Sequence, residues 1–295
     1  MRESKLKDLT KEQLEKYRSE GLSFKKIADK YKVAETSVIK KAKKFGIDTK
    51  WDIDKNKYFN IYAFDTLETE EQAYWLGFLF ADGYIRSDKH YRIELELKYS
   101  DIGHIKKFKD FLKDTRDDSI IKERNRVSFG TNVKMAKYTV YNKHIVNTVI
   151  SYGCFSGKSL ILKFPDKSIF KKKEIIIDFI RGYIDGDGCL CKNGERLCIE
   201  VLGTYDVISN IHKIFPEFPN IYERENQFEL SCTGSKADLV AHKLYGNATV
   251  YLDRKYNKYA TLCKLYTGEK SGNIGEGCDA NTEITSEITK GPEES

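Results

Sequence analysis

The chain has 295 residues, of which 40% are hydrophobic, 33% charged and 13% aromatic, and its formal net charge is +6. This composition is typical of a globular protein with enough apolar material for a core, and it excludes a largely disordered chain. No apolar run approaches the ~20 residues of a membrane-spanning helix and no secretory signal is evident at the N-terminus, so we expect a cytoplasmic protein without a membrane partner.

The positive charge is concentrated near the N-terminus. Residues 1–50 hold 15 Lys and Arg against 8 Asp and Glu, a net charge of +7, whereas residues 268–295 hold 2 against 7, a net charge of −5. A basic head on a mildly basic body fits a polyanionic partner such as nucleic acid. The acidic segment 268–295 is rich in Thr, Glu, Ser and Gly, and we expect it to be disordered.

The seven cysteines show neither a disulfide framework nor zinc-finger spacing. Cys189 and Cys191 are two residues apart, but no second Cys or His pair stands at the spacing of a zinc site. We therefore expect buried or incidental thiols that stay reduced in a cytosolic compartment.

Residues 1–50 are predicted to form a small domain of three short helices. Apolar residues recur at helical spacing between residues 9 and 47, and Gly21 and Gly46 end two of the runs. A short helix, a turn and a second helix resemble a helix-turn-helix, which places its recognition helix in the major groove. The alternative is a plain three-helix bundle with a solvated Lys face. The outer side of the third helix supplies the expected DNA contacts: Thr36, Ser37, Lys40, Lys41 and Lys44.

Residues 51–68 lack a clear period and are predicted to be a linker. From residue 69 to 166 the pattern predicts a first half, which opens on a helix with a capping box formed by Thr69 and Gln72. Alternation of apolar and polar residues indicates strands after that helix. The elements expected in this half are helices 69–82, 101–112 and 144–150 and strands 91–99, 120–129 and 135–141.

Residues 167–267 repeat this order more loosely, which indicates an internal duplication. The elements expected here are helices 174–187, 205–215 and 236–245 and strands 195–202, 220–224 and 227–232. The predicted fold class is therefore α+β, with two pseudo-symmetric αββαββα halves preceded by the three-helix domain.

The first helix of each half carries small residues four positions apart. These are Gly77 and Ala81 in one copy and Gly182 and Gly186 in the other. Because Gly inside a helix costs about 1 kcal/mol relative to Ala, such positions need a packing reason. Small residues at this spacing let two helices approach closely, so we expect the two copies to pack together.

Each of these helices closes on Asp followed by Gly, at Asp82 and Asp187. A carboxylate in the last helical turn is disfavoured by ~0.3–1 kcal/mol by the helix dipole, and packing the helices together adds repulsion. A divalent, oxygen-seeking cation between the two carboxylates would reverse both effects. The pattern therefore indicates a metal site.

Two plainer interpretations compete with the metal site. Asp-Gly can be a simple turn signal, although two copies in matched positions fit that poorly. Asp185–Gly188 could also be a calcium loop or a phosphatase motif, but the calcium loop would need an acidic residue where Arg196 stands. The phosphatase motif would need an Asp where the first copy has Phe80, so only the second carboxylate is shared. Asp185 is then expected to cap the helix or support the ligands.

Both nine-residue stretches, Trp75–Gly83 and Ile180–Gly188, resemble the LAGLIDADG motif of homing endonucleases, in the form with two motifs in one chain. The match covers roughly residues 69–265. Tyr74–Gly83 and the late segment Tyr251–Tyr256 are similar to phage and bacterial members in particular. The departures are Phe80, in place of the first Asp of the motif, and Arg181, where a small residue is usual.

The resemblance implies a saddle of two α+β halves that straddles double-stranded DNA, with the motif helices at its centre. It implies that Asp82 and Asp187 bind catalytic Mg²⁺, assisted by the carbonyl groups of Ala81 and Gly186. The implied activity is site-specific hydrolysis of both DNA strands at a long asymmetric target, by a monomer encoded by a mobile element such as an intron. The alternatives on the same scaffold are a catalytically silent DNA-binding regulator and a maturase that binds its own intron RNA.

Basic side chains complete the predicted site. Lys158, Arg254 and Lys255 are candidates for offsetting negative charge in the transition state, and each could instead contact a phosphate. Further basic residues recur on the polar faces of the predicted strands, where DNA would lie. These are Arg92, Lys98, Lys122, Arg124, Arg126, Lys137, Arg196 and Arg224.

Overall fold

The computed structural model describes residues 6, 8–19, 22, 24–47, 58–88, 90–128, 131–157 and 160–266. The expected disorder of 268–295 and the candidate Lys158 lie outside these residues, as does the predicted linker up to residue 57. The chain divides into two units, one from Met1 to Lys55 and the other from Asn56 to Ser295.

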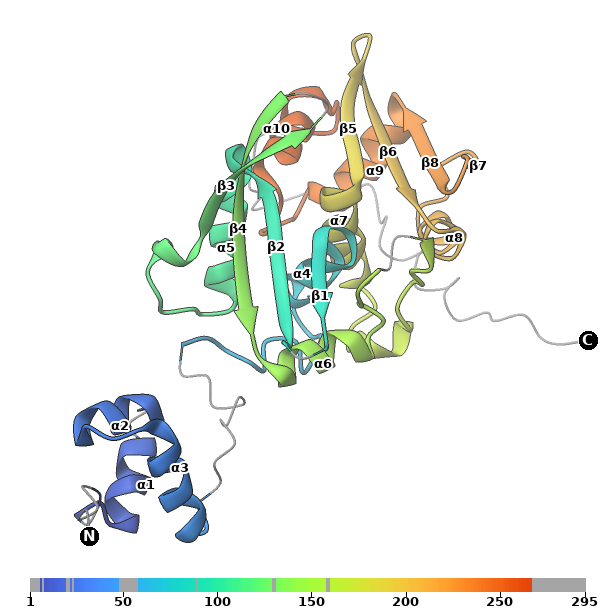
Figure 1. Cartoon of the computed structure of the whole chain (residues 1–295). Helices are drawn as coiled ribbons and strands as arrows, with labels where there is room; N and C mark the ends of the chain where they lie inside the picture. The colour runs from blue at the N-terminus through green and yellow to red at the C-terminus, as the bar shows by residue number, and fades with distance from the viewer. Residues whose placement is uncertain are drawn as a thin grey trace, which may run out of the picture. The chain divides into compact units, whose positions relative to one another are not determined.

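The N-terminal unit contains three helices, as predicted, labelled α1 (Lys11–Ser19), α2 (Phe24–Tyr31) and α3 (Glu35–Lys44) in Figure 1. Its own small core includes Ile27 of α2 together with Val38 and Ala42, which are one helical turn apart in α3. The turn between α2 and α3 passes through a left-handed residue, Lys32, with φ 51°. A shared core and a short turn between two short helices are features of a helix-turn-helix.

The first half of the larger unit has the predicted order of helices and strands. The capping box is confirmed, because the Thr69 side chain accepts from the Gln72 amide and the Gln72 side chain accepts from the Thr69 amide. The four strands are antiparallel neighbours in the order β1-β2-β4-β3. The elements are α4 (Glu70–Asp82), β1 (Gly83–Arg86), β2 (Arg92–Lys98), α5 (Ile102–Phe111), β3 (Lys122–Ser128), β4 (Thr131–Tyr141) and α6 (Lys143–Ser151).

The second half repeats this arrangement, with its strands in the matching order β5-β6-β8-β7. The predicted α+β duplication is therefore confirmed. The elements are α7 (Ile176–Asp187), β5 (Gly188–Asn193), β6 (Arg196–Gly203), α8 (Tyr205–Ile214), β7 (Ile221–Glu223), β8 (Phe228–Thr233), α9 (Ser235–Tyr245) and α10 (Asp253–Leu262).

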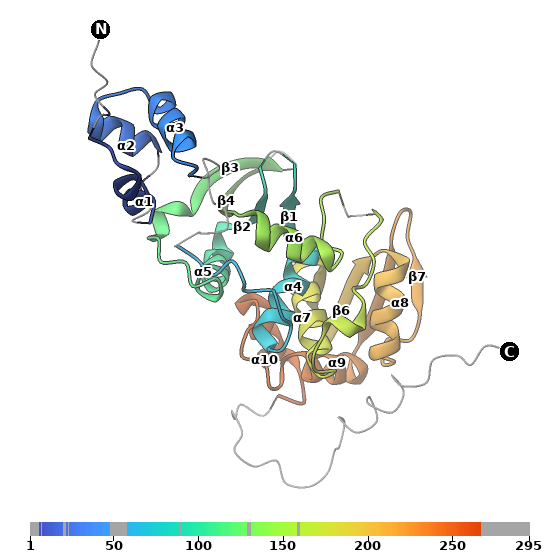
Figure 2. The same cartoon turned by 90° about the horizontal axis from the view of Figure 1, so that it is seen from below.

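The two motif helices lie between the two sheets. Figures 1 and 2 show α4 and α7 side by side, with one sheet on each side of the helix pair. Helices α5 and α6 pack on one face of the first sheet, and α8 and α9 pack on one face of the second. The buried side of β2 is formed by Ile93, Leu95 and Leu97, which alternate with the charged residues of the other face. Each sheet therefore keeps one polar face outside the core.

Three features differ from the sequence predictions. Strands β1 and β5 start at the glycine that follows each motif helix, so the chain turns from helix to strand without a loop. The part of the predicted linker that the structure describes is core rather than linker, because Phe59, Phe64 and Leu67 are buried and Leu67 pairs with Phe170. Helix α10, which buries Tyr259, was not among the expected elements.

Among the described residues, no helix combines the length and the apolar character needed to cross a membrane.

Candidate metal and nucleic-acid site

The glycines of the motif helices lie where the two backbones touch. A Cβ atom added to Gly77 would lie 1.9 Å from the Phe179 carbonyl oxygen, and one added to Gly182 would lie 2.0 Å from the Tyr74 carbonyl oxygen. Both distances are far shorter than any van der Waals contact, so no larger residue fits with the helices where they are. The close approach predicted from the small-residue spacing is confirmed.

The same packing brings the two Asp-Gly ends together. A Cβ atom on Gly186 would lie 2.3 Å from the Ala81 Cβ atom and 3.4 Å from Oδ2 of Asp82. Because Gly186 directly precedes Asp187, the carboxylates of the two copies lie at the adjoining C-terminal ends of α4 and α7. Both Asp82 and Asp187 are exposed, so an ion and a substrate can reach them.

Asp185 occupies a different environment from its neighbour Asp187. It is fully buried and accepts hydrogen bonds from Oη of Tyr74 and Oη of Tyr245, each at 2.7 Å, and from the Leu252 amide at 2.8 Å. Burial and the Asp185 charge raise the pKa of both tyrosines well above the usual range, so they remain donors. Asp185 is therefore an internal anchor for α7 rather than a helix cap.

Lys255 closes the C-terminal end of α7. Its side chain is buried, and Nζ lies 2.5 Å from the Ile184 carbonyl oxygen, 2.8 Å from that of Asp185 and 2.6 Å from that of Gly188. Burial lowers the pKa of Lys255 to about 8, so the ammonium group remains mostly protonated at neutral pH. Its three donors are used on carbonyl oxygens at the end of α7 and the start of β5, and the Gly186 carbonyl is not among them. Lys255 thus fixes the chain around Asp187.

Arg254 lies on the exposed side of the same segment. Its Nε donates to Oδ2 of Asp101 at 3.0 Å, and this pair links α10 of the second half to the turn before α5 of the first. Half of the Arg254 side chain is exposed, so it can still turn toward a phosphate. Arg254 and Lys255 therefore lie at the same end of α7, but Lys255 is buried and Arg254 is half-exposed.

Arg181, a departure from the motif, and Glu70, for which no role was predicted, form a buried ion pair. Arg181 is buried and donates to Oε1 of Glu70 at 2.6 Å, to Oδ1 of Asp178 at 2.7 Å and to the Val250 and Leu244 carbonyl oxygens, each at 3.0 Å. Removing one partner of a buried ion pair typically costs about 3–5 kcal/mol. The pair ties the start of α4 to the middle of α7, and an Arg in place of a small motif residue was the only sequence signal for it.

The predicted DNA-contacting residues of the first half share the polar face of its sheet. Cross-strand register places Lys122 opposite Lys137 and Lys137 opposite Glu96. Acidic residues on this face pair with some of the basic ones, because Arg124 binds Glu96 and Lys137 lies 3.5 Å from Glu94. The basic residues that alternation in β2, β3 and β4 puts on this face are Arg92, Lys98, Lys122, Arg124, Arg126 and Lys137.

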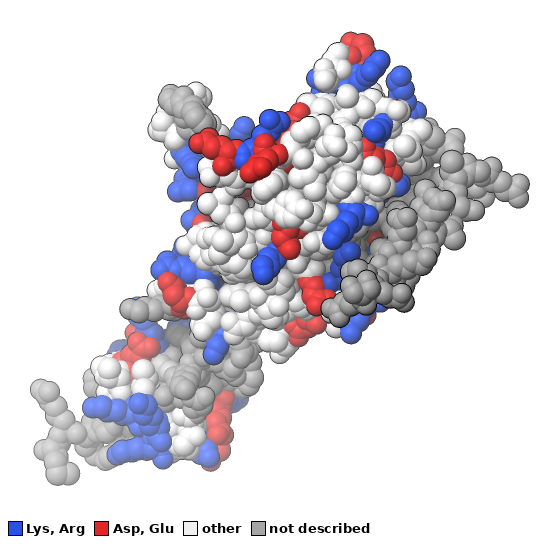
Figure 3. All heavy atoms as spheres, turned by 90° about the vertical axis from the view of Figure 1, so that its right-hand side faces the viewer, with Lys and Arg blue, Asp and Glu red and all other residues white. Residues whose placement is uncertain are grey.

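The polar face of the second sheet is less basic. Arg196 is exposed at the start of β6, and Arg224 follows β7 and donates to Oε2 of Glu229 at 2.7 Å. Figure 3 shows the flank of this half, where Lys and Arg are interspersed with Asp and Glu over a mostly uncharged surface. The equivalent polar faces of the two sheets therefore differ in their content of basic residues.

In the N-terminal unit, the structure places all five predicted contact residues outward or partly outward. Thr36, Lys40 and Lys44 are exposed and Ser37 is half-buried. Lys41 is also half-buried, and its Nζ binds the Leu6 carbonyl oxygen and lies 5.6 Å from the centre of the Phe45 ring.

Neither a family model nor a curated protein sequence matches this chain. In structure it is similar to LAGLIDADG homing endonucleases over most of its length, at low sequence identity. The LAGLIDADG meganuclease I-AabMI bound to uncleaved DNA is 11% identical over 66% of this chain and 91% of its own, with a TM-score of 0.42. The homing endonuclease I-WcaI bound to its DNA recognition sequence is 13% identical over 77% and 94%, with a TM-score of 0.40. I-DmoI in complex with DNA and Mn is 17% identical over 58% and 90%, with a TM-score of 0.31.

Proposed function

We propose that this protein is a site-specific double-strand DNA endonuclease that uses Mg²⁺ held by Asp82 and Asp187. The observation that carries the proposal is the close packing of α4 and α7, which places two exposed carboxylates at the adjoining C-terminal ends of these helices. Two carboxylates placed together by a tightly packed scaffold repel each other, and a divalent cation between them would turn this repulsion into attraction. The arrangement is therefore best explained by a metal-dependent reaction.

The residues present fit an oxygen-seeking cation. Asp82 and Asp187 offer carboxylate oxygens, and the carbonyl groups of Ala81 and Gly186 lie in the last helical turn, where carbonyls lack partners within the helix. Such hard oxygen donors suit Mg²⁺. When bound, the cation supplies an activated water and stabilises the leaving oxygen of the phosphodiester.

The surrounding side chains position the carboxylates. Lys255 holds the carbonyls before and after Asp187, and Asp185 anchors the preceding turn through two tyrosines. Fixed geometry of this kind lowers the reorganisation needed when the reaction occurs. Arg254, exposed nearby, is the side chain proposed to reach the scissile phosphate.

Double-stranded DNA is the proposed substrate because basic residues share the polar face of the first sheet and the outer side of α3. Arg and Lys contacts to phosphate fix the register of a protein on a duplex, and the halves then read different base edges. Since the two halves of the chain are not identical, a monomer would bind an asymmetric target.

The test uses a duplex that joins the two sequences flanking the gene, with the gene itself removed. Incubation with Mg²⁺ should cut both strands at one position, and chelation of the metal should stop the reaction. Mapping both ends by sequencing gives the cleavage position. Tight duplex binding without strand breaks would contradict the proposal and favour a silent regulator, and tight binding to intron RNA alone would favour a maturase.

A further inference from the structure

Three cysteines and a glutamate gather on the polar face of the second sheet, at the β5–β6 hairpin. Antiparallel register puts Cys191 directly opposite Cys198, and Cys189 directly opposite Glu200. Alternation along both strands turns all four side chains to the same face. We call Cys189, Cys191, Cys198 and Glu200 the hairpin cluster.

Three side chains of the hairpin cluster lie within reach of a single ion. The Sγ atoms of Cys191 and Cys198 and a carboxylate oxygen of Glu200 all lie within 4.8 Å of one another. With Zn–S bonds of about 2.3 Å, ligands around a tetrahedral zinc ion lie about 3.8 Å apart. Small rotations of these side chains would therefore complete three of the four bonds.

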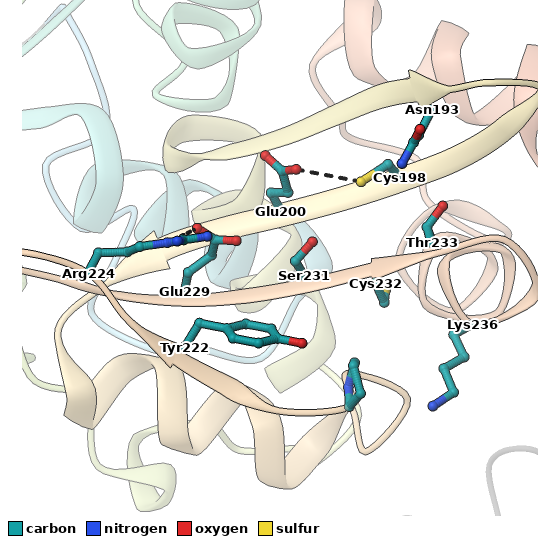
Figure 4. A pocket seen from close by; sticks show the side chains of 11 residues that line it. Asn193, Cys198, Glu200, Tyr222, Arg224, Glu229, Ser231, Cys232, Thr233 and Lys236 are labelled. Atoms are coloured by element: carbon teal, nitrogen blue, oxygen red, sulfur yellow. Dashed lines mark hydrogen bonds and ion pairs between the residues drawn. The ribbon is translucent and has the colours of Figure 1, made fainter.

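Cys189 is the fourth member of the cluster. It interacts with the thiol of Cys191 and is exposed, whereas Cys198 is almost fully buried. The cluster is thus shielded on one side and open on the other, which leaves a path for an ion to enter. Figure 4 shows Cys198 and Glu200 at the edge of a hollow of about 490 Å³, with their side chains directed toward one another.

We propose that the hairpin cluster binds a thiophilic divalent cation, Zn²⁺ in the cell, through its thiolates and Glu200. Cys thiolates with a carboxylate form a ligand set that selects zinc over magnesium, so this site is chemically distinct from the one at Asp82 and Asp187. Arg224, whose charge interacts with that of Glu200, is already paired with Glu229. A zinc ion would join β5, which starts directly after Asp187, to β6 at the centre of the second sheet.

Cobalt substitution tests the proposal on the full chain. Co²⁺ bound by thiolates in a tetrahedral site gives an intense charge-transfer absorption that oxygen ligands do not give. We expect wild-type protein to develop this absorption with one Co²⁺ per chain, and excess Zn²⁺ to remove it. Replacing both Cys191 and Cys198 by Ser should remove the absorption, since both central thiolate ligands are lost.

Matched variants separate this site from other cysteines and from the carboxylates. Cys154→Ser changes a buried thiol of the first half that donates to the Leu79 carbonyl oxygen, a bond that a hydroxyl group can keep. That variant and Asp82→Asn should both retain the full absorption. Zinc should raise the unfolding temperature of wild type but not that of the double Ser variant.

Results from either of two experiments, cobalt spectroscopy and peptide mass mapping, would overturn the zinc proposal. One is the absence of a thiolate band in reduced wild-type protein, or its persistence in the double Ser variant. The other is a disulfide between Cys191 and Cys198 in protein purified without oxidant, found by peptide mass mapping, because a bonded pair cannot supply thiolates.

Discussion

Asp82→Asn and Asp187→Asn are each expected to lower the rate of double-strand cleavage by about 1,000-fold or more, because each change removes a charged metal ligand worth several kcal/mol in the transition state. The amide is almost the same size as the carboxylate, and both positions are exposed, so the fold should be retained. The rate is measured under single-turnover conditions with saturating enzyme, which separates chemistry from binding.

A matched acidic residue outside the site controls for loss of negative charge. Glu195 lies in the exposed turn between β5 and β6 and pairs only with the exposed Lys192 among the ion pairs of the described residues. Glu195→Gln should cleave at the wild-type rate. Wild-type cleavage by either Asp variant would show that these carboxylates do not hold the catalytic metal.

Gly182→Ala is expected to destabilise the protein by about 3 kcal/mol, at the upper end of the cost of overpacking. The added Cβ atom would lie 2.0 Å from the Tyr74 carbonyl oxygen, and a backbone atom cannot move aside as a flexible side chain can. The helices must separate, which also moves Asp187 away from Asp82. Urea unfolding of the variant measures the change in the free energy of unfolding.

Gly103→Ala in α5 is the control for this prediction. Nothing lies within 4 Å of a Cβ atom at that position, so the change brings the higher helix propensity of Ala without overlap. Its free energy of unfolding should rise by up to about 1 kcal/mol. A Gly182→Ala variant as stable as wild type would mean that the two backbones do not approach as closely as described.

The elements that sequence predicted well are those with a strong local period. Examples are the capping box at Thr69, the alternation in β2 and the small residues of the two motif helices. Each of these patterns reflects contacts within one element or between two equivalent elements. The predicted αββαββα order includes β1 and β5, but their bounds could not be assigned because each strand follows its helix with no turn residues other than the first Gly. Periodicity over so few residues carries little information.

The supports of the candidate site could not be predicted, because they join distant parts of the chain. Arg181 reaches Glu70 and the carbonyl oxygen of Val250, and Asp185 accepts from Tyr74 and the amide of Leu252. A sequence motif identifies the carboxylates but says nothing about which buried groups hold them. Burial also decides between roles, since Asp185 and Asp187 differ in environment although they are two residues apart.

The cysteines and the linker show the same limit. Cys198 is seven residues from Cys191 in sequence, and only the β5–β6 register sets it opposite. Residues 58–67 lack a period because they fill gaps in the core rather than form a regular element. In both cases the tertiary fold, rather than local spacing, determines what the residues do.

Manganese binding gives the most direct test of the central claim, that two glycine-lined helices bring Asp82 and Asp187 together to hold a divalent cation. Electron paramagnetic resonance counts bound Mn²⁺ on the protein in complex with duplex DNA, and Mn²⁺ favours oxygen over thiolate ligands. We predict that Asp82→Asn and Asp187→Asn each reduce Mn²⁺ binding, while Cys191→Ser leaves it unchanged. Equal Mn²⁺ binding by wild type and by a variant that lacks both carboxylates would contradict the claim.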